Sequence, residues 1–157
     1  MNNSSLIAKQ VRDAHFGGNW TGVNLMDTLA DISWEEATKK IYSLNTIAAL
    51  VFHMNYYVDA VLNVLHGEPL TASDKYSFDA PPIHSGGDWK KLIDKTWRQA
   101  RELAELIDKL PDTKLNETFA DEKYGTYYRN LHGIVEHIHY HLGQIALIKK
   151  LLRHTAE

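Results

Sequence analysis

The sequence contains no cysteine among its 157 residues, and this absence excludes disulfide bonds, thiolate metal ligands and a cysteine nucleophile. Several catalytic motifs are absent too: there is no glycine-rich phosphate loop, no Gly-x-Ser-x-Gly elbow and no nucleotide-binding fingerprint. The zinc-peptidase motif His-Glu-x-x-His is also missing, because His137 is followed by Ile138 and His139. Any metal site in this chain must therefore use histidine, aspartate or glutamate.

Charge of one sign and long apolar runs are also scarce. The formal net charge is -3, and the short basic groups are three lysine pairs, at 39–40, 90–91 and 149–150. Because binding to phosphates usually needs clustered Lys and Arg, we expect no nucleic-acid partner. The first ten residues lack the pattern of a secretory signal, and no stretch reaches the roughly 18 apolar residues of a membrane span. These absences predict no membrane association and a cytoplasmic location.

The chain does contain strong helical periodicity. Its length fits one domain over residues 1–157. Apolar residues recur at helical spacing in four long segments and two short ones, and no strand alternation is present. The predicted long helices span residues 6–15, 46–65, 88–110 and 126–154, and the short ones span residues 21–30 and 33–40. The predicted fold class is all-α, and a four-helix bundle is the economical arrangement.

Helical phase separates the nine histidines. His137 and His141 lie four residues apart on a stripe of aliphatic residues, so both are expected to face the interior. Two imidazoles at this spacing can each direct a ring nitrogen to one metal ion about 2.0–2.1 Å away. His139 is turned by about 200° from His137, and His132 also lies off the stripe, so both are poor ligand candidates. The alternative for the inward pair is a hydrogen-bonded role in the core.

His53 is the predicted third ligand, because it lies within the apolar stripe of the second long helix, on the face of Leu50 and Tyr57. Three inward histidines on two helices leave coordination positions open, which is typical of catalytic rather than structural metal sites. The remaining histidines fall at helix ends or in loops and are interpreted as structural; these are His15, His66, His84 and His154.

Other polar residues are weaker candidates. Tyr57 lies one turn after His53, and Gln144 lies two turns after His137, so both could line the cavity or simply pack. Residues 69–87 form the longest irregular segment, and loops this long are often functional, which makes this segment a candidate cover for the site. Acidic pairs in polar surroundings are interpreted as solvent-facing; these are Glu35 with Glu36, Glu102 with Glu105, and Asp121 with Glu122.

Four parts of the chain carry a resemblance to a known family. They are the segments 15–22, 46–53 and 67–69, and the His-x-x-x-His-x-Gly-Gln-Ile pattern that begins at His137. With these parts the chain resembles the DinB-like superfamily of metal-dependent enzymes, which includes the YfiT type. The resemblance covers most of the chain, and the histidine pattern is its most specific part.

This resemblance implies a four-helix up-down-down-up bundle, often dimeric, with a divalent ion such as zinc or nickel at one end of the bundle. The family ligands match His53, His137 and His141 of this sequence. Similar proteins include mycothiol-dependent maleylpyruvate isomerase and bacillithiol transferases, but many members have no known activity. Many relatives have a Trp-Glu pair shortly after the first histidine, where this chain has Tyr57 and Val58.

The leading hypothesis from the sequence is a metal-dependent enzyme with a three-histidine site. It would be a thiol-dependent S-transferase or a hydrolase that acts on a small molecule, with a low-molecular-weight thiol as a candidate partner. The alternative is a non-catalytic, metal-stabilised dimeric bundle or a damage- or stress-response binding protein. The sequence leaves a homodimer open, since its four tryptophans fit a core or an interface equally well.

Overall fold

The computed structural model describes residues 2–154, and its secondary structure is helical. Among these residues there is no β-strand, and a single isolated bridge joins Thr118 to Thr126. This confirms the predicted all-α class. The α-helices are α1 (Asn3–Phe16), α2 (Leu25–Leu29), α3 (Trp34–Thr38), α4 (Ile47–Leu65), α5 (Gly86–Asp108) and α6 (Tyr127–His154). Short 3₁₀ turns follow at η1 (Asp74–Tyr76), η2 (Asp112–Asn116) and η3 (Glu122–Tyr124).

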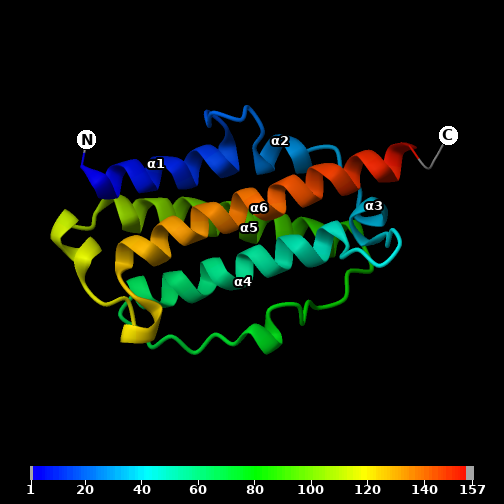
Figure 1. Cartoon of the computed structure of the whole chain (residues 1–157). Coiled ribbons are helices and arrows are strands. Elements are labelled where there is room, and N and C mark those ends of the chain that lie inside the picture. Colours follow the sequence, from blue (N-terminus) through cyan, green and yellow to red (C-terminus); the bar gives the residue numbers. More distant parts are fainter. Residues whose placement is uncertain (1, 155–157) are drawn as a thin grey trace.

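The four long helices lie side by side (Figure 1). Helices α1 and α6 run in one direction, and α4 and α5 run in the other. Helix α1 packs against α5 and α6, and α4 packs against the same two helices. The enclosed core consists of two apolar clusters, one of which includes Val58 and Ile138, and the other Leu50 and Ile145. Since α4 and α6 contribute to both clusters, residues between these stretches lie at the boundary of the two.

Side-chain caps explain where the helices begin. The hydroxyl of Thr46 accepts a hydrogen bond from the amide of Ala49 at the start of α4, as an N-cap should. The predicted capping box is present at α3, where Ser33 and Glu36 each bond the other's backbone amide. Ser85 caps α5, which therefore begins two residues before the predicted start at residue 88.

Helix α4 is unusually apolar. By length and composition it could cross a membrane, which the sequence interpretation did not expect, but 67% of its most apolar window is buried inside the molecule. Most of this apolar surface therefore packs in the core of the molecule.

The four tryptophans differ in environment. Trp89 is buried, and Trp34 and Trp97 pack against the apolar cluster that contains Leu50. Trp20 is fully exposed. Three of the four tryptophans therefore pack in or against the core, and Trp20 is the most exposed of the four.

Candidate metal centre

Three histidines converge between α4 and α6. His53 comes from α4, and His137 and His141 come from successive turns of α6. His53 and His141 are buried and His137 is partly buried, and one ring nitrogen from each lies within 4.8 Å of the others. The predicted inward orientation of all three is confirmed. The cluster lies midway along α6, at the boundary of the two apolar clusters, rather than at one end of the helices as the resemblance implies.

The same ring atom of each histidine points to the centre of the cluster. The Nε2 atom of His137 lies 3.1 Å from Nε2 of His53 and 3.0 Å from Nε2 of His141. Two nitrogens that each lie about 2.0–2.1 Å from one ion are about 3.0 Å apart at a right angle and about 3.4 Å apart at the tetrahedral angle. The observed separations therefore suit three ligands of a single ion.

The outer nitrogens fix the protonation of two of these rings. Nδ1 of His53 donates a hydrogen bond to the carbonyl of Ser77 at 3.2 Å, and Nδ1 of His141 donates to Oε1 of Gln144 at 2.7 Å. A neutral imidazole that donates from Nδ1 carries a lone pair on Nε2. Both rings thus direct lone pairs toward Nε2 of His137, whose single hydrogen could satisfy only one of them. A cation at the centre would satisfy all three.

Burial keeps the three rings neutral, as metal ligands must be. Burial, followed by the proximity of His141 and His53, lowers the pKa of His137 to about 4. Burial also lowers the pKa of His53 and of His141. The Nδ1 atom of His137 is buried and has no hydrogen-bond partner within residues 2–154. The three histidines therefore direct neutral, metal-ligating nitrogens inward, and the cluster fits a divalent ion.

The loop between α4 and α5 covers one side of the cluster, as its length suggested. The carbonyl of buried Ser77 holds His53, and the ring of Phe78 stacks on the His53 imidazole with 4.0 Å between centroids. Tyr56 anchors the same loop, because its hydroxyl donates to the carbonyl of Ser73 and accepts from the Ser73 amide. These contacts connect residues about 20 positions apart, so helical periodicity gave no signal for them.

A cavity of about 830 Å³ opens beside the cluster. His53, His137 and Tyr57 line it, so two of the candidate ligands face a space large enough for a small molecule. The hydroxyl of Tyr57 donates to Oδ1 of Asp74 at 2.6 Å. Burial, and then this hydrogen bond, raises the pKa of Tyr57, so the phenol stays a neutral donor. Gln144, in contrast, lies behind His141 and orients its ring.

The other histidines and acidic pairs lie outside this centre. His139 and His132 line a different groove, between α6 and the loop after α1. His15 is buried and donates from Nδ1 to the carbonyl of Val11. Among the acidic pairs, Glu36 caps α3 and Glu102 bonds His66. Neither of these glutamates lies beside the metal centre.

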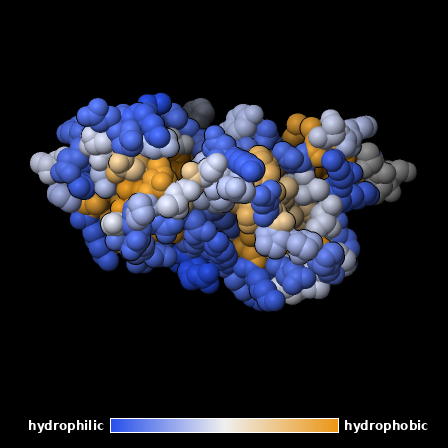
Figure 2. Space-filling model, turned by 90° about the horizontal axis from the view of Figure 1, so that it is seen from below, coloured by the Kyte–Doolittle hydropathy of each residue, from blue (hydrophilic) through white to orange (hydrophobic). Residues whose placement is uncertain are grey.

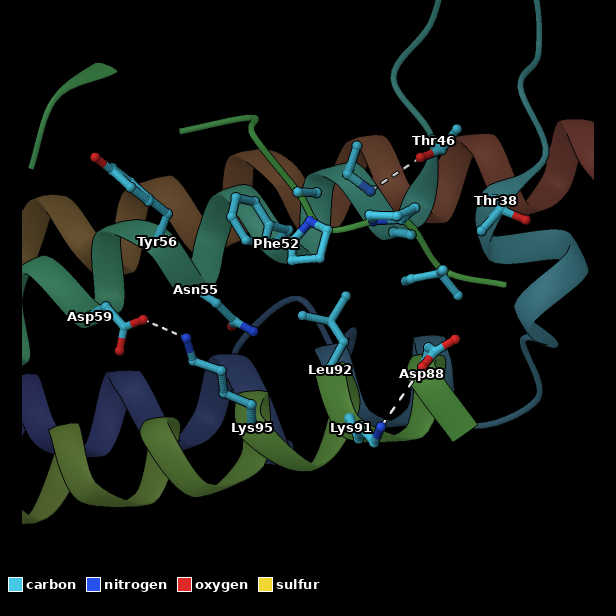
Figure 3. A pocket seen from close by; sticks show the side chains of 16 residues that line it. Thr38, Thr46, Phe52, Asn55, Tyr56, Asp59, Asp88, Lys91, Leu92 and Lys95 are labelled. Atoms are coloured by element: carbon cyan, nitrogen blue, oxygen red, sulfur yellow. Dashed lines mark hydrogen bonds and ion pairs between the residues drawn. The ribbon is translucent and has the colours of Figure 1, made fainter. Parts of the chain in front are cut away.

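A second cavity, of about 550 Å³, lies between α4 and α5 (Figure 3). Its charged side chains neutralise one another, since Lys95 bonds Asp59 at 2.6 Å and Lys91 lies 3.8 Å from Asp88. No histidine occurs among the described residues that line it. Seen from below the view of Figure 1, apolar residues gather in separate patches, with hydrophilic residues between them (Figure 2). The histidine-lined cavity is therefore the better candidate for chemistry.

Comparison with models of known protein families supports the sequence resemblance. Residues 10–145 match the model described as the DinB superfamily. The matched region includes all three converging histidines. Comparisons with curated proteins and with solved structures gave no match. Because the family match covers most of the chain, the protein belongs to the DinB superfamily.

Proposed function

We propose that the protein is a metal-dependent enzyme that acts on a small molecule, as a thiol-dependent S-transferase or a hydrolase. His53, His137 and His141 would hold one divalent ion, zinc or nickel. The observation that carries this proposal is the convergence of three Nε2 atoms, with Nδ1 of His53 and of His141 each committed to a carbonyl acceptor. Three protein ligands leave coordination positions for water or substrate.

The ion, when bound, would polarise a coordinated water or thiol and lower its pKa toward neutrality. Protein side chains supply the rest. Tyr57 presents a neutral hydroxyl at the cavity wall, where its oxygen can accept a hydrogen bond from a bound substrate. Asp74 accepts the hydrogen of this hydroxyl and so fixes the orientation of the phenol. Phe78, stacked on His53, shields that ring from water.

The helix topology, the location and the oligomeric state of the protein form part of the same proposal. We infer that α1, α4, α5 and α6 make the four-helix up-down-down-up bundle expected for the family, and that the protein works as a cytoplasmic homodimer. The antiparallel arrangement of the helices supports the bundle, and fully exposed Trp20 supports a protein contact. Light scattering after size exclusion tests the dimer, which a single-chain mass would refute.

The activity is tested with a panel of thiols and electrophilic substrates, and with ester and amide substrates for hydrolysis. The parent protein, loaded with zinc or nickel, should turn over at least one member of the panel, and a chelator should stop the reaction. His137→Ala should be inactive, and His139→Ala, a matched change on the same helix outside the cluster, should keep the parent rate. Stoichiometric metal without turnover across the panel would instead favour a non-catalytic, metal-stabilised bundle.

A further inference from the structure

The cavity beside the metal centre also has a positively charged region, formed by Lys123 and Arg129. Within residues 2–154, neither side chain forms an ion pair with a carboxylate, whereas several other basic residues of the chain do. Lys123 places its ammonium group over the ring of Tyr124, 4.9 Å from the centroid. Two cations without acidic partners at one end of a cavity favour a negatively charged ligand.

The acidic residues that line the same cavity do not neutralise these cations. Asp74 accepts the hydroxyl hydrogen of Tyr57, and Glu136 lies 3.5 Å from Nδ1 of His132. Both acids lie toward the histidine end, since Tyr57 contacts the rings of His53 and His137, and Glu136 precedes His137. The positive charge is thus separated from the metal centre along the cavity.

The backbone that carries the two cations is fixed. Gly125, between Lys123 and Arg129, has a φ of 76°, which favours glycine. A Cβ atom there would come within 3.2 Å of Cδ of Arg129, so glycine also leaves room for the arginine side chain. The Gly125 carbonyl accepts from the amide of Phe119 at 2.9 Å. The segment is therefore held in place before any ligand binds.

The spacing of the two regions defines the size of the ligand. Arg129 precedes His137 by eight residues on α6, which corresponds to about 12 Å along the helix axis. The arginine side chain lies against Gly125, which precedes α6, so it does not shorten this separation. Apolar side chains line the space between, including those of Val61, Leu70 and Ile134. The matching ligand has a reactive group at one end, an apolar middle that spans this separation and an anionic group at the other.

We propose that Arg129 and Lys123 bind a carboxylate or phosphate group of the substrate and so select small organic anions. The assignment of this ligand as a substrate rests on the proposed function, but anion binding itself does not need the metal. Arg129 is the principal contact, because its planar guanidinium can bind either group with two parallel hydrogen bonds. Lys123 adds a second charge.

Ligand titrations of the metal-free protein test this proposal. Hexanoate and butyl phosphate represent the two kinds of anion, and neutral hexanamide is the matched control ligand. The NMR signal of the Arg129 side-chain Nε–H group reports contact. Because both cations are exposed, we expect at least one anion to bind about threefold to tenfold more tightly than hexanamide, with a preference that falls as salt is added. The tighter of the two anions identifies the favoured group.

Substitutions locate the binding site. Arg129→Gln combined with Lys123→Gln should remove the preference for anions and leave hexanamide binding unchanged. Arg98→Gln, an exposed position on α5 outside this cavity, should have no effect. Equal affinities of the parent protein for hexanoate, butyl phosphate and hexanamide would overturn the proposal, whether or not the variants fold. A preference that survives the double substitution would also overturn it. Since the protein is metal-free, failure of the metal hypothesis would not alter these outcomes.

Discussion

Lowering the pH from 7 to 5 should destabilise the protein by about 2 kcal/mol through His15 alone. This side chain is 2% exposed at the end of α1, and its Nδ1 donates to the carbonyl of Val11 at 2.8 Å. Burial is the largest cause that lowers its pKa to about 4, against about 6.5 in the unfolded chain. Below the unfolded pKa, the unfolded state therefore binds more protons than the folded state.

The direction and the size of the destabilisation follow from this difference in proton binding. The contribution of neutral His15 to the free energy of unfolding is fully present above about pH 6.5 and is lost as the pH falls toward 4. Each unit of difference between the folded and unfolded pKa corresponds to about 1.4 kcal/mol. The full loss is about 3.4 kcal/mol, of which about 2 kcal/mol falls between pH 7 and 5. His15→Gln cannot titrate and should lack this part of the pH dependence, even where its stability at pH 7 is lower.

The assay is urea unfolding of both proteins at the two pH values, with a chelator present so that metal release does not contribute. The other buried histidines titrate in both proteins, so the difference between parent and variant isolates His15. If parent and variant lose the same free energy of unfolding between pH 7 and 5, the assignment of a neutral, buried His15 is refuted.

Three further substitutions test the support of the metal centre and the local structure. Gln144→Leu removes the acceptor for Nδ1 of His141 and should weaken metal affinity about tenfold, measured by competition with a chelating dye; an unchanged affinity would refute this role. Tyr57→Phe removes the bond to Asp74 and should destabilise the covering loop by about 1 kcal/mol, seen as faster hydrogen exchange at the Ser77 amide; unaltered exchange would contradict it. Ser33→Ala breaks the capping box of α3 and should cost about 1 kcal/mol in thermal unfolding, whereas an unchanged melting temperature would show that the cap does not contribute.

The three histidines were predictable because their arrangement is local in sequence or follows helical phase. His137 and His141 share a face by their four-residue spacing, and the apolar stripe on α4 fixes the direction of His53. The residues that hold these rings were harder to find. Ser77 reaches His53 through a loop of irregular backbone, and no periodic pattern governs such a path.

Helix boundaries show the same difference between features that are local in sequence and features that lack a periodic pattern. The capping box of Ser33 and Glu36 was predictable from the sequence because both partners lie within one turn. Helix α1 instead begins at Asn3, three residues before the predicted start, because Asn2 caps it and polar residues fill its first turn. A polar turn gives no apolar periodicity. The charged end of the cavity was missed for a related reason, since Lys123 and Arg129 lie in and after a short 3₁₀ turn.

The metal content of the protein, purified without a metal-affinity resin, tests the central claim most directly. Elemental analysis should find one zinc or nickel ion per chain in the parent and in His139→Ala. His53→Ala, His137→Ala and His141→Ala should each lose most of it, while circular dichroism shows that the helices persist. A parent protein that holds no stoichiometric metal, even after incubation with zinc or nickel, would contradict the claim.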